Sequence, residues 1–244
     1  MRHLTILTLF FLAPAVPPVR AQDGDAEKLF RTMEQKLLAA KAFEVTFDYQ
    51  IEKRKVKGQM LVAQGNKIRL KAVGLFENKP KAGFELVADG KQLKTKGAKL
   101  FVASNGQSGM EEGGTSEWQT PKTFHKVLGS SVSRGGVWFT ILLLPYLRGA
   151  ESELEPDQLK ISVYDFKLIE AGGLGAKDAK VIRYRFGKGG PCPDDEEITL
   201  WIDAKTGLPL KRSFTLKNGN LRIVENYREV RLDPRIDARF KLPK

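Results

Sequence analysis

The feature that most restricts the fold of this chain is a strict alternation of apolar and polar side chains that starts at Phe43. Two sets alternate along residues 43–52: Phe43, Val45, Phe47, Tyr49 and Ile51 on one side, and Glu44, Thr46, Asp48, Gln50 and Glu52 on the other. A period of two residues with one apolar set is typical of a half-buried strand in an antiparallel sheet. The segment therefore predicts a sheet with one apolar face.

The same alternation recurs along the chain and predicts further strands. They are Val56–Ala63, Lys67–Val73, Phe84–Ala88, Gln92–Val102, Lys160–Ile169, Lys180–Phe186, Glu197–Asp203, Leu208–Leu216 and Leu221–Val230. Turn sequences that begin at Gln64, Asp89 and Ala204 separate neighbouring strands. No long helical pattern stands between these strands, which disfavours a parallel layout and favours one antiparallel sheet.

Residues 25–42 follow the spacing of an amphipathic helix instead. The apolar positions of this segment recur at helical intervals, and they are Ala26, Leu29, Phe30, Met33 and Leu37. Asp25 is a suitable N-cap for such a helix. We therefore expect a helix from Asp25 to Ala42 whose apolar stripe lies on the sheet.

The middle of the chain departs from both patterns. Ser104–Glu117 is rich in glycine and polar residues and predicts a mobile loop. Thr120–Leu128 predicts a short helix capped by Thr120, and the glycines of residues 129–136 predict its end. The segment from Val137 to Leu147 is the most apolar stretch after the N-terminus, but it is too short to span a bilayer. We expect a buried or cavity-facing helix there, interrupted near Pro145.

The first 21 residues have the three parts of a cleavable secretory signal. Arg2 and His3 form a basic start, residues 4–16 form an apolar run, and Val19 and Ala21 are the small residues before a cut ahead of Gln22. The apolar run is shorter than the roughly 20 residues that a membrane anchor needs. We therefore expect export to the periplasm, and a soluble mature protein with a single domain over residues 22–244.

The charge of the chain bears on its partners. The formal net charge is +12, and it becomes +10 once Arg2 and Arg20 leave with the signal. Export makes nucleic acid a poor candidate, so we expect no nucleic acid as a partner. An anionic membrane surface or an acidic envelope protein fits the basic runs near Lys53, Lys79 and Lys91, and a plain solubilising role is the alternative. The lone cysteine cannot form an internal disulfide, and we expect a monomer.

Catalytic signatures are few. His125 is the only histidine after the signal, which excludes a histidine-rich metal site, and we expect it at the surface of its short helix. The chain has no Gly-x-Ser-x-Gly elbow and no glycine-rich phosphate loop. Residues 194–197 form an acidic run without the alternating carboxylates of a calcium loop. A secreted hydrolase with two scattered carboxylates is the remaining catalytic alternative. We expect no enzyme and no cofactor.

Several segments, taken in order, resemble the bacterial outer-membrane lipoprotein carrier superfamily (LolA/LolB-like). They are the first helix running into Phe43-Glu-Val-Thr-Phe, the segment Leu86-Val-Ala-Asp-Gly-Lys-Gln-Leu, the segment Leu200-Trp-Ile-Asp-Ala-Lys-Thr-Gly-Leu-Pro-Leu-Lys, and the tail from Tyr227. The resemblance covers essentially the whole mature chain. It implies an α+β fold, namely an unclosed antiparallel β-barrel of about eleven strongly curved strands with helices covering the concave face.

The resemblance also implies a task, which is to hold acyl chains of lipids or lipoproteins in a hydrophobic hollow for transfer across the envelope. The residues that we expect to line this hollow come from the sheet and from its helical cover: Phe47, Tyr49, Met60, Ile68, Leu70 and Phe84, with Trp138, Phe139, Leu142, Leu143 and Tyr146. Ordinary core packing is the alternative interpretation of each residue. An envelope sensor or scaffold that binds a lipid signal or a protein partner is the alternative function of the same fold.

One position departs from the pattern of the classical carriers. Those proteins have an arginine in the early strands that ties the sheet to the covering helices and helps to couple closing to release. The comparable region here, residues 64–69, contains no clear counterpart, because Arg69 is displaced. The resemblance therefore supports the fold without supporting energy-linked lipoprotein trafficking.

Overall fold

One antiparallel sheet of eleven strands dominates the structure, which is a computed structural model. The residues that it describes are 20–52, 54–74, 83–102, 108–120, 122, 124–137, 162–169, 178–187, 196–216, 221–236 and 240–242. The strands are β1 (Ala42–Ile51), β2 (Arg54–Ala63), β3 (Lys67–Val73), β4 (Gly83–Asp89), β5 (Gln92–Val102), β6 (Ser108–Gln119), β7 (Ser162–Ile169), β8 (Ala179–Gly187), β9 (Glu196–Asp203), β10 (Pro209–Leu216) and β11 (Leu221–Leu232). The helices are α1 (Arg20–Ala39) and α2 (Phe124–Arg134).

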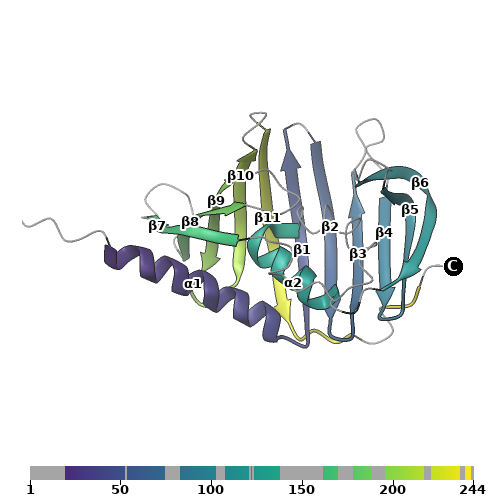
Figure 1. Ribbon diagram of the computed structural model, residues 1–244, viewed down its shortest axis with the longest axis horizontal. Helices are drawn as coiled ribbons and strands as arrows, with labels where there is room; N and C mark the ends of the chain where they lie inside the picture. The colour runs from purple at the N-terminus through teal and green to yellow at the C-terminus, as the bar shows by residue number, and fades with distance from the viewer. Residues whose placement is uncertain are drawn as a thin grey trace, which may run out of the picture.

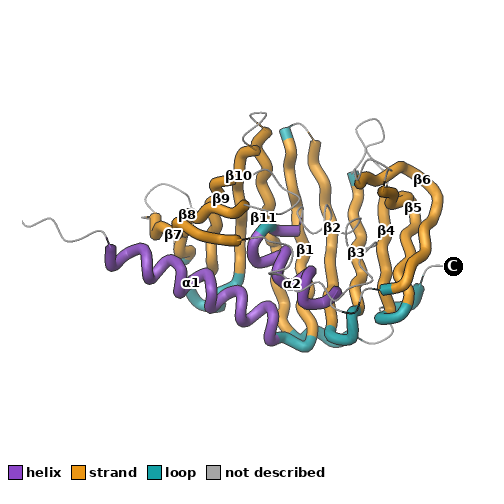
Figure 2. Tube along the Cα trace, viewed as in Figure 1, coloured by secondary structure: helices purple, strands orange, loops and turns teal. Residues whose placement is uncertain are grey.

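The strand order explains why a helical segment covers the sheet. The order is β6-β5-β4-β3-β2-β1-β11-β10-β9-β8-β7, so the chain starts in the middle, runs outward to β6, and restarts at the opposite edge with β7. The connection between β6 and β7 must cross the width of the sheet, and α2 lies within this connection. Both helices lie on the same face of the sheet (Figures 1 and 2). Since β6 and β7 stay unpaired with each other in this order, the barrel is unclosed.

These observations confirm the predicted fold class. Each pair of neighbouring strands is antiparallel, and β1 joins the two halves by pairing with both β2 and β11. The predicted hairpin turns are also confirmed. The Asp89 carboxylate accepts hydrogen bonds from the backbone N–H groups of Lys91 and Gln92, both at 2.8 Å, and these bonds lower the pKa of Asp89.

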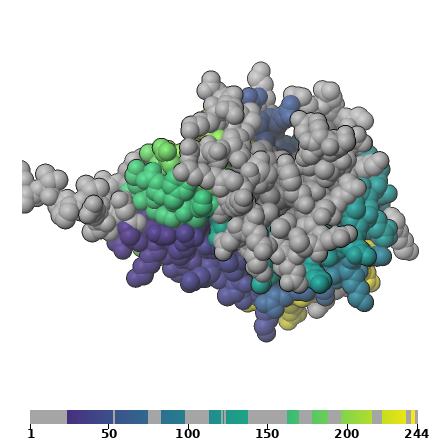
Figure 3. Space-filling view, in the orientation of Figure 1, coloured from purple at the N-terminus to yellow at the C-terminus, as the bar shows by residue number. Residues whose placement is uncertain are grey.

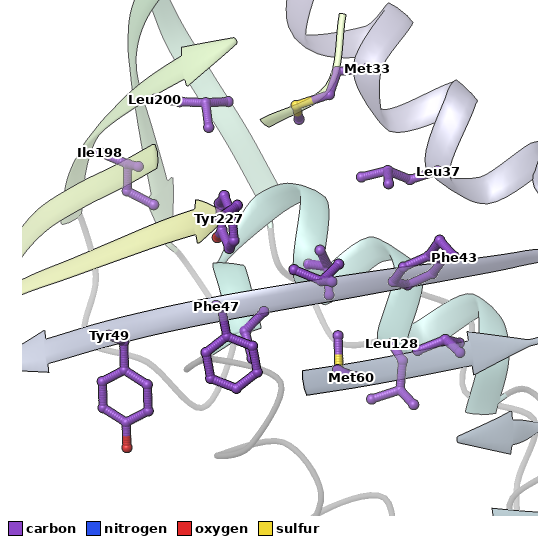
Figure 4. Packing of buried hydrophobic residues seen from close by; sticks show 14 of the residues in the cluster. Met33, Leu37, Phe43, Phe47, Tyr49, Met60, Leu128, Ile198, Leu200 and Tyr227 are labelled. Atoms are coloured by element: carbon purple, nitrogen blue, oxygen red, sulfur yellow. The ribbon is translucent and has the colours of Figure 1, made fainter. Parts of the chain in front are cut away.

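The core lies between the helices and the apolar face of the sheet (Figure 4). The predicted stripe of the first helix is confirmed, because Ala26, Phe30, Met33 and Leu37 are completely buried. The helix begins at Arg20 and ends at Ala39, since Ala42 already belongs to β1. The apolar set of β1 is buried as predicted, from Phe43 to Tyr49.

The predicted loop at Ser104–Glu117 is wrong for most of its length, because Ser108–Gln119 forms β6. An edge strand needs only backbone hydrogen bonds to one neighbour, so it can form without apolar alternation. Gly113 and Gly114 have positive φ angles and face the register shift of β5 between Lys96 and Ala98. The glycines that suggested a loop therefore form an irregularity inside a strand.

The predicted end of the second helix is also wrong, because α2 starts at Phe124 and continues through Gly129 to Arg134. A Cβ atom at Gly129 would lie 2.9 Å from Leu38 Cδ2 of α1. Glycine therefore allows the two helices to approach closely at this point, and it does not end the helix. Of the apolar segment predicted after residue 136, only Val137 lies within the described residues.

Candidate functional site

The structure brings together the six predicted site residues that it describes. Phe47 and Tyr49 come from β1, and the others come from the three following strands: Met60 from β2, Ile68 and Leu70 from β3, and Phe84 from β4. Each is at most 6% exposed, and all belong to the same apolar cluster. The other five predicted residues lie outside the described residues: Trp138, Phe139, Leu142, Leu143 and Tyr146.

Phe47 lies across the neighbouring strand, at a position where β2 has no side chain. Its register partner is Gly58, and a Cβ atom at Gly58 would collide with the ring of Phe47 and with the carbonyl oxygen of Lys71. Phe47 also stacks on Tyr49, with ring centroids 6.4 Å apart. The result is a broad aromatic surface on the inner face of the sheet, which Figure 4 shows from close by.

Helix α2 covers this surface with its own apolar side. Phe124, Val127, Leu128 and Val132 are buried in the same cluster, and α2 contacts β2 and β3. We call the inner side chains of β1–β4 together with this side of α2 the covered apolar face. The described side chains of this face are packed, so a ligand could reach them only after part of the cover moved.

A buried arginine fastens the end of α2 to the sheet. Arg212 of β10 is completely buried, and its Nη2 donates hydrogen bonds to the carbonyl oxygens of Val132 at 3.0 Å and Ser133 at 2.6 Å. These carbonyls belong to the last turn of α2, where helical carbonyl groups have no partner within the helix. A cation at the C-terminal end also complements the helix dipole.

Further buried polar groups complete this connection. Arg212 Nη1 donates to the hydroxyl of Tyr227 at 3.2 Å, that hydroxyl donates to Glu225, and Glu225 Oε2 accepts from the backbone N–H of Val137 at 3.0 Å. The hydroxyl of Tyr184 in β8 donates to the carbonyl oxygen of Arg134 at 2.6 Å. We call Arg212, Glu225, Tyr227 and Tyr184 the buried polar cluster. It joins three strands to the C-terminal end of α2.

The ionisation of this cluster follows from its burial and its charges. Burial raises the pKa of Tyr184 to about 12, although the nearby Arg212 opposes the shift. Burial also raises the pKa of Tyr227 well above its usual value. For Arg212, burial disfavours the charge, but Tyr184, Tyr227 and Glu225 favour it and raise the pKa overall. Arg212 is therefore a permanent buried cation, and both phenols stay protonated as hydrogen-bond donors.

Helix α1 holds the same end of α2 from the other side. The carboxylate of Glu34 accepts hydrogen bonds from Arg134 Nε at 2.9 Å and from Ser133 Oγ at 3.2 Å. Arg31 of α1 pairs with Glu34 at 3.1 Å. The last turn of α2 is thus held by the sheet and by α1, whereas the middle of α2 is held by apolar packing.

The buried polar cluster does not follow from the alternation of apolar side chains, although the sequence contains a signal for it. Arg212 and Glu225 are direct register partners on β10 and β11. Glu225 lies between Ile223 and Tyr227, both of which are buried, so a period of two places its carboxylate on the apolar side of the strand. Opposite charges at inward positions of neighbouring strands were the signal that could have found the pair.

Arg69 forms its ion pair with Glu85 of the neighbouring strand β4 and not with a helix. Its Nε and Nη2 both lie 3.0 Å from Glu85 Oε1, and its side chain is 33% exposed. Arg69 alternates with Ile68 and Leu70, which are buried on the inner face, so it lies on the outer face. Within the described residues, Arg212 is the arginine that joins the sheet to α2.

His125 is not on the surface as the sequence suggested, because only 9% of it is exposed. Its Nε2 has no hydrogen-bond partner among the described residues, and burial lowers its pKa. The start of α2 packs against the β2–β3 turn, where Asn66 Oδ1 accepts from the backbone N–H of His125 at 3.2 Å. Among the residues that the structure describes, no group of three His, Cys, Asp or Glu residues is placed to hold a metal ion.

Comparisons with known proteins give structural likenesses only. No family model matches the chain, and a search of curated proteins finds no match. Among solved structures, the chain is similar to MucB, with a TM-score of 0.45, 16% identity, and coverage of 90% of this chain and 63% of that chain. It is also similar to an uncharacterized conserved protein from Thermus thermophilus, with a TM-score of 0.44, 12% identity, and coverage of 90% of this chain and 95% of that chain.

A third likeness is to a LolA superfamily protein from Nitrosomonas europaea, with a TM-score of 0.31, 10% identity, and coverage of 89% of this chain and 97% of that chain. The chain spans just under two thirds of the length of MucB. The unclosed-barrel fold rests on the strand order and helix positions of this chain itself.

Proposed function

We propose that this chain binds acyl chains of lipids or lipoproteins on its covered apolar face and carries them between membranes of the envelope. The observation that carries the proposal is a continuous apolar surface on an unclosed sheet, under a helix whose last turn is fastened by a buried polar cluster. Phe47, Tyr49 and Met60 belong to that surface, and Arg212 is the principal anchor.

The energetics of a carrier favour such an arrangement. At roughly 0.8 kcal/mol per methylene, one 16-carbon chain gains on the order of 10 kcal/mol by leaving water. Several fully enclosed chains would exceed the practical limit of affinity, near about 20 kcal/mol, and would not be released. An unclosed sheet with a movable cover shelters a chain only in part, and release remains feasible.

Opening would exchange one set of contacts for another. The apolar side of α2 would leave the inner face, and an acyl chain would take its place against Phe47, Met60 and Leu70. The hydrophobic free energy lost by α2 would then be offset by that gained by the ligand. The chain can therefore be closed when empty and open when loaded, with the buried polar cluster as the connection that yields or pivots.

The cellular setting belongs to the same proposal. A signal at residues 1–21 and a single domain over residues 22–244 would place the chain in the periplasm, where acyl chains pass between two membranes. Among the described residues, no helix combines the length and the apolar character needed to cross a membrane. The chain would act without chemistry on its ligand, so a bound lipid would leave unaltered.

The direct test is to purify the chain after export from bacteria, extract it with organic solvent, and identify the extracted molecules by mass spectrometry. The expected result is an unaltered phospholipid or acylated peptide in an amount close to that of the protein. An empty protein that also fails to bind a fluorescent diacyl lipid would contradict the proposal and favour a scaffold. An altered lipid would favour an enzyme.

A matched pair of variants tests whether the ligand binds to the inner face of the sheet. Leu70→Gln introduces an amide on the inner face, and Lys71→Gln introduces the same amide on the adjacent outward position, which is exposed. Only Leu70→Gln should weaken binding of the diacyl lipid, provided that circular dichroism shows both variants folded. Equal affinities for both folded variants would exclude the covered apolar face.

A further inference from the structure

A groove of about 620 Å³ lies between α1 and the edge of the sheet formed by β7 and β8. Figure 3 shows α1 directly beside these strands. The residues that line the groove are Asp25, Lys28, Leu29 and Thr32 of α1, Leu168 and Ile169 of β7, and Ala179, Lys180 and Val181 of β8. Its volume falls within the roughly 300–1,000 Å³ of small-molecule sites.

The groove combines apolar walls with a charged rim. Leu168 is 38% exposed, and it is one of three large apolar side chains in the described part of the chain that are at least 37% exposed. Lys28 and Lys180 are exposed, and within the described residues neither takes part in an ion pair. Asp25 is the one carboxylate in the lining. The rim therefore carries one net positive charge above an apolar wall.

The groove does not depend on the position of α2. Next to it, Phe30 of α1 packs against Phe166 of β7 and Tyr184 of β8, with ring centroids 5.2 and 4.9 Å apart. The guanidinium carbon of Arg31 lies 5.7 Å from the centroid of Phe166. These contacts fix α1 on the sheet edge, so the groove stays open while the covered apolar face is closed.

We propose that this groove binds an amphiphile with a single acyl chain and an anionic head group. The acyl chain would lie against Leu29 and Leu168, and the head group would lie near Lys28 and Lys180. A carboxylate and a phosphate monoester present the same chemistry to two lysines, so a fatty acid and a lysophosphatidate are both suitable ligands. The inference deepens the proposed function, on which it rests, because it adds an open binding position for lipids beside the closed one.

The proposed role of charge can be tested with variants that should change the affinity for anions in opposite directions. Dodecanoate, lysophosphatidate with a 12-carbon chain, and uncharged dodecanol are each titrated into the purified chain. Because exposed charge pairs are weak, the double variant Lys28→Gln/Lys180→Gln should bind the two anions roughly 3- to 10-fold less tightly. Asp25→Asn should bind them more tightly, and Lys205→Gln, in the exposed turn before β10, should change nothing. Dodecanol affinity should be the same in all variants.

The two anions identify the source of the ligand, since the tighter binder shows whether a carboxylate or a phosphate fits the rim. Equal affinities of all variants for both anions would overturn the inference. If a lysine variant that circular dichroism shows folded binds dodecanol as weakly as it binds the anions, the inference is also overturned, because the lysines then do not recognise the charge.

Photolabelling separates this inference from the proposed function. A fatty acid with a diazirine in its chain is bound, irradiated, and located by peptide mapping. Labels in residues 24–32, 168–169 and 179–181 support the groove. Labels confined to residues 43–72 would overturn the groove while supporting the covered apolar face. No label anywhere, together with an empty extract, would contradict both.

Discussion

Arg212 Nη2 of β10 donates a 2.6 Å hydrogen bond to the carbonyl oxygen of Ser133 in the last turn of α2. The bond joins a strand near one end of the chain to a helix that lies 79 residues earlier in the sequence. Since Arg212 is fully buried, the bond is charge-assisted in a medium of low dielectric constant, and its loss would leave a buried charge with fewer partners. This contact makes the position of α2 testable by single substitutions.

Replacing Arg212 by methionine should lower the free energy of unfolding by about 3–5 kcal/mol, because Glu225 and the last carbonyls of α2 lose their buried partner. The backbone amides of α2 should exchange with solvent faster than those of α1. Denaturant unfolding measures the first effect and hydrogen exchange the second. Arg183→Met is the control, because Arg183 pairs with Glu197 at the surface. Equal effects of both variants would contradict the assigned role.

Gly136 should not tolerate alanine. Its φ is 85°, and a Cβ atom there would collide with Glu225 and Arg212. Gly113 has a similar φ of 81° but nothing within 4 Å of a Cβ atom. Gly113→Ala therefore measures the cost of the backbone conformation alone, about 1–2 kcal/mol. Unfolding experiments should show that Gly136→Ala costs at least about 1 kcal/mol more, by analogy with other disrupted buried hydrogen bonds. A smaller difference between the two variants would mean that Glu225 and Arg212 can move aside without loss of stability.

Gly58 should not tolerate a larger residue, because the ring of its register partner Phe47 occupies the space of a side chain. Gly58→Ala should destabilise the chain by about 1–3 kcal/mol, because the added methyl group overpacks the inner face against the ring and the backbone of β3. Gly83→Ala is the control, since its nearest neighbour would be 4.0 Å away. Phe47→Leu should recover part of the loss in a double-mutant cycle. Additive effects of Gly58→Ala and Phe47→Leu would show that the two residues do not compete for space.

His125 should make the stability of the chain depend on pH near neutrality. Burial lowers its pKa in the folded chain, so the unfolded chain, with a value of about 6.5, binds more protons. The contribution of the neutral side chain is therefore complete above about pH 6.5 and is lost as the pH falls, by at most about 1.4 kcal/mol per pH unit. Unfolding curves between pH 8 and pH 5 should fall more steeply for the natural chain than for His125→Leu. Parallel profiles would contradict this prediction.

Much of the fold could be predicted from the sequence because side-chain alternation reports burial on one face. The strands from Phe43 to Val102 and from Ser162 onward were recognised in this way, and so was the stripe of α1. The strand β6 was missed because an edge strand forms through its backbone and needs no apolar period. The length of α2 was misjudged because Gly129 serves a close contact with Leu38 that only the tertiary structure shows.

The apolar residues of the candidate site could be predicted from the sequence, whereas its buried charged residues could not. Phe47, Met60 and Leu70 follow from periodicity, since apolar side chains at alternate positions gather on one face. Arg212 and Glu225 do not, because charged residues are usually placed outside in such a pattern. Their burial depends on pairing between β10 and β11 and on the arrival of α2, and neither is a local property of the sequence.

Lipid binding under α2 is tested most directly by measuring the distance between α2 and the sheet with and without a bound diacyl lipid. Spin labels at Lys126→Cys on α2 and Arg222→Cys on β11, in a chain with Cys192→Ser, report that distance by pulsed electron paramagnetic resonance. A second pair on the sheet, Lys57→Cys with Arg222→Cys, is the reference. If the lipid binds under α2, saturating lipid should lengthen the first distance and leave the second unchanged. An unchanged first distance in a chain that has bound the lipid would contradict binding under α2.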